Sequence, residues 1–351
     1  MRVLNFLKSW TDKHPEDFLA EKALRETFFK FCTENTGIHA VKLKRMMKAL
    51  KRTLISIRAG DKAQTKIQQI ITETIPKPFP ISASADLKHL KVYDFHHEEV
   101  ARQMCLLDFQ LFFTLQPREL LNYDKVENQS RACPALSKML RNSQILQDWV
   151  LYEVFCKVTG DEEHDTEVFL EKLTFFVEIC NSCFQLSNFQ AFFSIFQAIS
   201  SPEVRERGDL WKSLDTATKG KLTALEKHME NMESLEGFRS SISKVGERFS
   251  SAGIPPVQIF LKDLRQVEEE EENFIKDHEN RINMSKHVHK ATIINQFSSY
   301  KNIPYSFETV EWLQNYVASE IPRLASFRSG ISFVDQFKTL GSYHITKRFT
   351  N

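Results

Sequence analysis

Apolar residues recur every three or four positions along most of this chain. This spacing places side chains on one face of an α-helix and differs from the strict alternation of a half-buried strand. Glycine and proline are scarce, at 10 and 11 of 351 residues, where average usage would give about twice as many glycines. The pattern predicts an all-α fold with few strands. It argues against a doubly wound nucleotide-binding fold, whose turns need glycine.

The same periodicity predicts three helices near the N-terminus and a longer series after a break. The first helix carries Val3, Phe6, Leu7 and Trp10 on its buried face and ends near Pro15. Asp94 and Asn188 are predicted N-caps, because short polar side chains accept hydrogen bonds from the first free amides of a helix. The remaining helices are expected at about 17–32, 38–58, 94–116, 134–158, 164–185, 188–200, 216–232, 234–249, 257–268, 284–300, 306–320 and 332–340.

A proline-rich segment separates the two groups of helices. Residues 76–80 read Pro-Lys-Pro-Phe-Pro, which cannot form a helix and is typical of a stiff linker. We therefore expect a partial helical domain over residues 1–75, a linker over 76–87 and a second domain over 88–351. Because the chain begins directly with a helical pattern, it is expected to be a fragment of a longer protein.

The formal net charge is only +1, so the chain as a whole is not expected to be attracted to a polyanion. One local exception is the polar face of the predicted helix 38–58. Two interpretations remain open for it: a solvated helix face, or a surface for an anionic membrane or partner. Nucleic acid is not expected, because no stacking aromatics interleave with the charges. The basic residues of this face are Lys42, Lys44, Arg45, Lys48, Lys51, Arg52 and Arg58.

Motifs for covalent chemistry and phosphate binding are missing. The chain has no GxGxxG, GxxxxGK[ST], GxSxG or HExxH pattern. Cys180 and Cys183 form a CxxC in an apolar run, but no second pair lies at zinc spacing. We expect buried structural thiols in a reducing compartment, no metal and no cofactor. The His and Glu residues of 96–99 are expected to form a solvated helix start.

Membrane insertion is not expected from the sequence. No apolar run approaches the ~20 residues of a membrane span. Lys8, Asp12 and Lys13 interrupt any signal-peptide pattern at the N-terminus. The sequence therefore predicts a cytoplasmic protein.

Several sequence segments indicate more about the chain than its composition does. They read VARQMCLLD at 100–108 with LQPREL at 115–120, KMLRNSQILQDWV at 138–150, LSNFQAFFSIFQAISSPEVRERGDLW at 186–211, and IPPVQIFLKDLRQVEEEEEN at 254–273 with RINMSK at 281–286. In this order they resemble the catalytic domain of Ras guanine-nucleotide exchange factors (RasGEFs), over about residues 88–345. The start, VLNFLKSWTDKHPEDF, resembles the end of the Ras exchanger motif (REM) domain that precedes such domains.

The resemblance implies a mechanical function without covalent catalysis, and the chain would not be an enzyme in that sense. In this family a hairpin of two helices, matching residues 256–300, opens the nucleotide site of a small GTPase. Arg265 matches the side chain that approaches the Mg²⁺ site, and Glu269 matches a carboxylate aimed at the phosphate-binding loop. The family usually has a small or apolar residue at the first position. Five consecutive Glu replace Glu-Glu-Gly, so Glu268 is an alternative in register, and a solvated acidic loop is the simpler interpretation.

The resemblance also implies a pocket that binds the second switch region of the GTPase. Leu140, Phe193, Phe238 and Pro256 match its lining, and Arg141 matches a basic residue beside it. Ordinary core packing is the alternative for the four apolar residues, and an exposed rim charge is the alternative for Arg141. Within the segment 187–190, Asn188 is expected to cap a helix and support the scaffold.

Three hypotheses follow from these patterns. The first is an active exchange factor for a Ras-family GTPase, with Ras or Rap more consistent than Ral or Rho. The second is an adaptor with this fold that binds a GTPase or signalling partner without exchange. Three departures from the family pattern keep it open: Arg265 at a small or apolar position, Pro256 where an aromatic residue is common, and Ser187 in place of the first Asn of Asn-Asn-Phe-Asn. The third is a membrane-docking helical module built on the helix 38–58.

Overall fold

The computed structural model describes residues 2–35, 37, 39–58, 75–155, 162–234, 236–240, 252–275 and 278–329. Helices dominate these residues, and the strands among them form a single two-stranded sheet. The predicted all-α class is therefore confirmed. Internal contacts divide the chain into two compact units, Met1–Ile71 and Thr72–Asn351, and each unit is described by itself. No described helix is long and apolar enough to cross a membrane.

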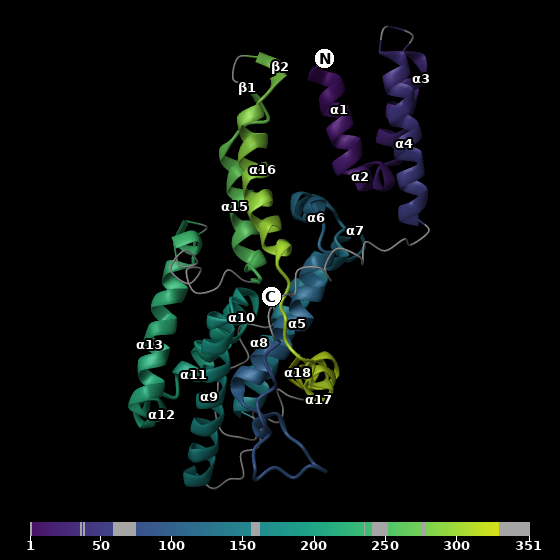
Figure 1. Ribbon diagram of the computed structural model, residues 1–351. Helices are drawn as coiled ribbons and strands as arrows, with labels where there is room; N and C mark the ends of the chain where they lie inside the picture. The colour runs from purple at the N-terminus through teal and green to yellow at the C-terminus, as the bar shows by residue number, and fades with distance from the viewer. Residues whose placement is uncertain are drawn as a thin grey trace. The chain divides into compact units, whose positions relative to one another are not determined.

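The described residues of the first unit form four helices around a small apolar core. They are α1 (Arg2–Lys13), α2 (Pro15–Ala20), α3 (Lys22–Glu34) and α4 (Ala40–Arg58). Figure 1 shows α1 to α4 in purple. The single helix expected at 17–32 is broken at Glu21, whose backbone is extended. The core consists of Leu4, Phe18, Phe28, Cys32, Leu43, Met46, Leu50 and Leu54.

The buried face of α1 differs from the predicted one. Leu4 is buried, whereas Val3 and Phe6 are 67% and 62% exposed. Leu7 and Trp10 pack partly against the core. The apolar spacing of α1 admits two overlapping stripes, and the one through Leu4 meets the core of this unit.

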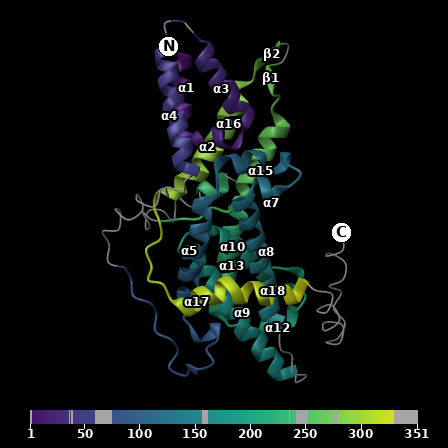
Figure 2. The ribbon, with the colours of Figure 1, turned by 90° about the vertical axis from the view of Figure 1, so that its right-hand side faces the viewer.

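Long helices form the body of the second unit. They are α5 (His97–Thr114), α8 (Pro134–Phe155), α9 (Glu162–Gln185) and α10 (Phe189–Ile199). Helix α10 contacts both α8 and α9, and α5 contacts α9 and α8. Figure 2 shows α18 (Ile321–Ser329) crossing in front of these helices, where it packs on α8. The other helical elements of the body are η2 (Val92–Asp94), α6 (Pro117–Asn122), η3 (Tyr123–Lys125), α7 (Gln129–Ala132), α11 (Pro202–Arg205), α12 (Gly208–Ser213), α13 (Thr216–Asn231), η4 (Tyr300–Asn302), α17 (Glu311–Asn315) and η5 (Tyr316–Glu320).

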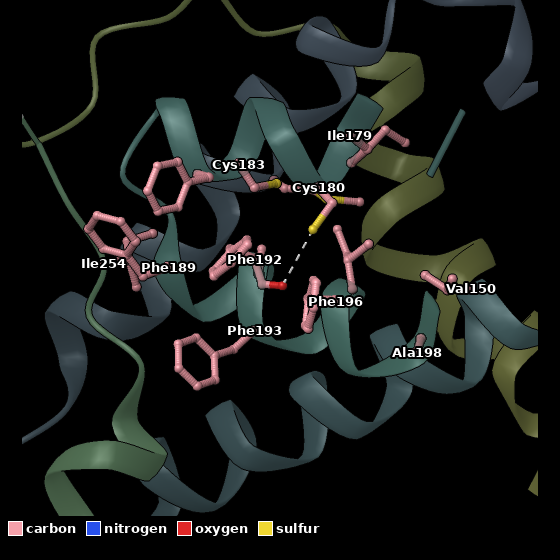
Figure 3. Packing of buried hydrophobic residues seen from close by; sticks show 14 of the residues in the cluster. Val150, Ile179, Cys180, Cys183, Phe189, Phe192, Phe193, Phe196, Ala198 and Ile254 are labelled. Atoms are coloured by element: carbon pink, nitrogen blue, oxygen red, sulfur yellow. Dashed lines mark hydrogen bonds between the residues drawn. The ribbon is translucent and has the colours of Figure 1, made fainter. Parts of the chain in front are cut away.

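The core between α9 and α10 is built from phenylalanine and cysteine side chains. Figure 3 shows Cys180 above α10, where its thiol donates a 3.8 Å hydrogen bond to the carbonyl of Phe192. Cys180 and Cys183 are both fully buried, and burial raises the pKa of each thiol well above its usual value. Both therefore stay protonated and pack as small apolar groups.

A helical hairpin extends from the body. It consists of α15 (Val257–Glu270), β1 (Phe274–Ile275), β2 (His278–Ile282) and α16 (Met284–Ser299). The strands pair antiparallel, with Phe274 opposite Ile282. They lie at the end of the hairpin away from α10, as Figures 1 and 2 both show.

Three local predictions in the second unit are wrong. The helix start at 96–99 is not wholly solvated, because Glu99 is buried at 1% exposure. Asp94 does not cap α5: its carboxylate accepts a 2.7 Å hydrogen bond from the amide of Lys91, and His96 is the N-cap. The helix expected at 306–320 begins only at Glu311 and continues through α18 to Ser329. Pro322 has no amide to donate to the preceding turn, and residues 316–320 adopt a π-helix there. The helix expected at 332–340 lies outside the described residues.

The proline-rich segment is non-helical, as expected, and it packs on the second unit. The amide of Phe79 donates a 3.1 Å hydrogen bond to the buried Glu99 carboxylate. The Phe79 ring stacks on His96 and lies under the Arg102 guanidinium. Residues 77–79 are therefore anchored to α5. The domain limits 1–75, 76–87 and 88–351 stay predictions.

Candidate functional site

The base of the hairpin is held by apolar packing. Phe260 and Phe297, one from each helix, are almost fully buried, and their ring centroids lie 5.0 Å apart. Leu264 and Ile293 are also buried beside them. Such contacts anchor the lower halves of α15 and α16 in the body of the second unit.

The N-terminus of α15 is fixed by the loop that precedes α10. Asn188 forms a bridge with Ile254, and the amide of Phe189 donates a 3.0 Å hydrogen bond to the Ile254 carbonyl. The side-chain oxygen of Gln190 accepts a 2.8 Å hydrogen bond from the amide of Val257, the first residue of α15. Gln190 therefore satisfies a helix-start donor and ties α15 to α10.

Asn188 supports the scaffold, as expected from the sequence. Its side chain is fully buried, accepts from the amide of Ala191 and caps α10. Its amide nitrogen donates a 2.9 Å hydrogen bond to Asp108. Burial raises the pKa of Asp108 to about 6, and the hydrogen bond from Asn188 opposes part of that rise. The predicted capping role of Asn188 is confirmed.

Arg265 lies on α15 and is held by an ion pair across to η3. Its Nε and a terminal nitrogen donate 2.6 and 2.8 Å hydrogen bonds to the two carboxylate oxygens of Asp124. The Arg265 guanidinium holds the pKa of Asp124 below its usual value, while partial burial of Asp124 works against this. Such bidentate pairing fixes the direction of the guanidinium. In the free protein Arg265 is therefore directed towards η3.

The two candidate carboxylates of the acidic run differ sharply. Glu268 forms ion pairs with Lys125, Lys286 and Lys290. Glu269 is exposed, and within the described part of the chain no hydrogen bond or ion pair holds its carboxylate. Glu269 is therefore the carboxylate of this pair that is free to meet a partner. Both line a cavity of about 300 Å³ together with Leu120, Leu121, Asp124, Lys125, Leu264, Arg265 and Lys290.

Of the residues predicted to form a switch-binding pocket, Phe193, Phe238 and Leu140 belong to one apolar cluster. Phe193 and Pro256 are buried, Leu140 is half-buried, and Arg141 is exposed. Figure 3 shows Phe193 on the side of α10 opposite Cys180. Leu140 and Arg141 are thus the members that present surface.

Phe238 is the least accessible member of that set. Its side chain is 0% exposed, and its ring meets Phe189 and Phe260 edge to face, at centroid distances of 5.4 and 5.8 Å. This geometry favours the core interpretation, because a partner reaches Phe238 only if these neighbours move. A direct role of Phe238 in binding stays a prediction.

Several residues at the base of the hairpin were missed by sequence reasoning. Asp124 and Lys125 lie in η3, a short element that no apolar periodicity announces. Lys286 and Lys290 are buried lysines on α16. A signal for Lys286 was available, since it ends the RINMSK segment already singled out. Their role depends on contacts across the fold, which sequence spacing does not encode.

Comparison with known proteins agrees with this geometry. Residues 99–288, more than half of the chain, match the RasGEF domain. Ras guanine nucleotide exchange factor A of Dictyostelium discoideum is 24% identical over 90% of this chain and 50% of its own length. Ras-GEF domain-containing family member 1A of Xenopus tropicalis is 22% identical over 90% of this chain and 68% of its own length. Protein son of sevenless of Drosophila melanogaster is 25% identical over 87% of this chain and 18% of its own length. The chain thus spans about half of the first relative and a small part of the last. The described helices, the hairpin and the matched residues together place this chain in the RasGEF domain family.

Proposed function

We propose that this chain promotes GDP release from a Ras-family small GTPase. The observation that carries the proposal is the α15–α16 hairpin, which bears an exposed, unpaired Glu269 in a chain of the RasGEF family. A carboxylate brought near bound GDP repels its phosphates, and loss of Mg²⁺ removes their charge neutralisation. The exchange factor then stabilises the nucleotide-free GTPase, and nucleotide affinity falls by linkage.

The upper hairpin has the surface that such a partner needs. Phe274, Ile275, Ile282, Met284 and Val288 are all large apolar residues with about half or more of their surface exposed. Contiguous exposed apolar surface marks protein or membrane interaction sites in soluble proteins. Its neighbours Glu269–Glu272 are acidic, which disfavours an anionic bilayer and favours a protein surface.

Exchange of this kind is not covalent catalysis, and we propose that it requires no metal or cofactor bound to this chain. Among the described residues no group of three or more His, Cys, Asp or Glu is placed to hold a metal ion. We further propose a Ras or Rap protein as substrate, rather than Ral or Rho; the names of the relatives support only the Ras part of this proposal.

A second candidate function is an adaptor that binds a GTPase without exchange. The ion pair of Arg265 with Asp124 favours it, because the family position for a small or apolar residue is here occupied by a tethered cation. Removing that tether costs the pairing energy before Arg265 can approach a Mg²⁺ site, where its charge would also be repelled.

The first unit suggests how the chain is placed in the cell. We propose that the first unit is the end of a REM domain. We also propose that the protein is cytoplasmic and that α4 recruits the protein to anionic membranes. Lys42, Lys44, Arg45, Lys48, Lys51 and Arg52 are all exposed on α4. Exposed basic residues on an amphipathic helix attract anionic lipid headgroups by about 1 kcal/mol each. Co-sedimentation with phosphatidylserine vesicles tests this, and equal binding to neutral vesicles would contradict it.

A nucleotide-release panel decides between exchange factor and adaptor. Purified Ras, Rap, Ral and Rho proteins are loaded with a fluorescent GDP analogue and mixed with the chain and excess GTP. Faster release from a Ras or Rap protein supports exchange. Binding without faster release, measured on nucleotide-free and GDP-loaded GTPases, supports the adaptor.

A further inference from the structure

Apolar packing of the hairpin ends partway along its length. On α15 the last buried apolar residue is Leu264, and on α16 the buried apolar residues begin at Ile293. Beyond them, Val288 and Met284 are exposed. Both hairpin helices also contact α6. Above Leu264 the half-buried Val267 still packs against the core, and the other contacts that hold the hairpin there are polar contacts with the α6–η3 segment.

The first of these contacts is the pair Arg265–Asp124. It joins the residue directly after Leu264 to η3, with two hydrogen bonds in a fork geometry. The side chains are 50% and 43% exposed. The pair therefore lies at the edge of the apolar base, where a change in hairpin angle would stretch it first.

The second contact is centred on Glu268, one turn further along α15. Its carboxylate pairs with Lys286 and Lys290 of α16 and, at 3.7 Å, with Lys125 of η3. Lys286 is only 2% exposed and also donates a 3.1 Å hydrogen bond to the Glu268 carbonyl. One carboxylate thus links α15, α16 and η3, and its removal would leave a buried lysine uncompensated.

We propose that Asp124 and Lys125 of η3 are positioning residues that set the angle of the hairpin through Arg265 and Glu268. Arg265 then acts by holding α15 on η3, and its charge is neutralised before a partner arrives. These two ion pairs can break and re-form at low cost, because partly exposed ion pairs are individually weak. The angle of the hairpin is therefore adjustable. The effect on nucleotide exchange rests on the proposed function, whereas the hold on the hairpin does not.

Charge reversal separates this role from simple loss of a side chain. The variants are Asp124→Arg, Arg265→Asp and the double swap, with Asp124→Asn as a milder change and Glu270→Gln as the matched control. Among the described residues, the Glu270 carboxylate has a hydrogen bond only to Gln266 of its own helix. Amide hydrogen exchange is measured over residues 264–272 and 284–290, because local opening is reported there without any GTPase.

Each single variant of Asp124 and Arg265 is expected to speed hydrogen exchange in these segments about two- to five-fold, and the double swap to restore most of the protection, while Glu270→Gln leaves it unchanged. Glu268→Gln is expected to have a larger effect, of about ten-fold or more, because it strands Lys286. The proposal would be overturned if protection were unchanged in the single variants of Asp124 and Arg265. It would also be overturned if the double swap sped hydrogen exchange as much as the two single variants combined.

The nucleotide-release assay on the same variants gives the functional arm. A change in hairpin angle is expected to lower the maximal release rate about three-fold or more while altering the half-saturating GTPase concentration less, with rescue by the swap. If the wild-type chain releases GDP from no GTPase, the proposed function fails, and hydrogen exchange alone still decides the positioning role. Normal maximal rates in variants with faster hydrogen exchange would overturn the link between hairpin angle and exchange.

Discussion

Helices α10 and α15 are joined by the hydrogen bond from the amide of Val257 to Gln190, but they differ in what surrounds them. All residues of α10 except Gln197 are buried, and six of its eleven residues are Phe or Ile. The buried residues of α15 all lie within its first eight positions, and beyond them Glu269 and Glu270 are exposed. A helix closed on all sides is fixed by its fold, whereas one that is half open depends on few contacts and is available to a partner. Mutations should therefore act on stability in the body and on partner binding or release in the hairpin.

The largest effect is expected in the body, from Phe238→Ala. A fully buried ring that contacts Phe189 and Phe260 leaves a cavity when truncated, so the free energy of unfolding should fall by about 3–5 kcal/mol. Leu140→Ala is the matched control and should cost less, because Leu140 is only half-buried. Urea unfolding and GTPase association are measured on the same samples. A stable Phe238→Ala variant that fails to bind would show that Phe238 is a binding residue after all.

The next effect is expected on the open half of α15, from Glu269→Ala. If this carboxylate enters the phosphate site, its removal should slow GDP release by roughly 10- to 100-fold, corresponding to about 1–3 kcal/mol. Unfolding should be unchanged, since no described contact holds the side chain. Glu272→Ala, further along the exposed run, is the control and should retain the wild-type rate. Equal rates in both variants would mean that the hairpin acts by shape alone.

A smaller effect is expected from the exposed apolar residues of the upper hairpin, called the apolar tip: Phe274, Ile275, Ile282, Met284 and Val288. Met284→Ser and Val288→Ser should leave the unfolding free energy within about 0.5 kcal/mol, because both side chains are more than half exposed. GTPase association should weaken by about three- to ten-fold, as for apolar contacts outside the centre of an interface. Val41→Ser, equally exposed on α4 of the first unit, is the control. Titration calorimetry with nucleotide-free GTPase distinguishes these outcomes.

The smallest effect is expected from the half-buried carboxylate of Asp108. Its pKa is raised from the ordinary 3.8 to about 6 by burial, so ionisation costs more in the folded state, and stability should fall as pH rises from about 4 to about 6. Asp108→Asn removes that cost and keeps an acceptor for Asn188. Because Asp108 retains some exposure, the gain at pH 8 should be about 1 kcal/mol. Melting temperatures at pH 4 and pH 8 test it, and an equal gain at both would refute the titration.

The contrast between body and hairpin also marks what the sequence could predict. Helices α8, α9 and α10 were predicted within a few residues because their apolar spacing is strong and Asn188 caps locally. The short elements α6 and η3 were missed, since three to six residues show no period. Arg265 and Glu269 could be placed on α15 by resemblance, but the partner of Arg265 lies 141 residues away in sequence. Contacts at that separation follow from the tertiary fold and leave no local signature.

The position of the charged contacts makes the hairpin a lever. From Lys290 to Met284 along α16 is about 9 Å at the helical rise, and the five residues of β2 add up to about 16 Å. A rotation of 10° about the Glu268 contacts would therefore move the far end by roughly 4 Å. Such a displacement exceeds the length of a hydrogen bond. A tilt of a few degrees at the Glu268 contacts would therefore change how the apolar tip fits a partner.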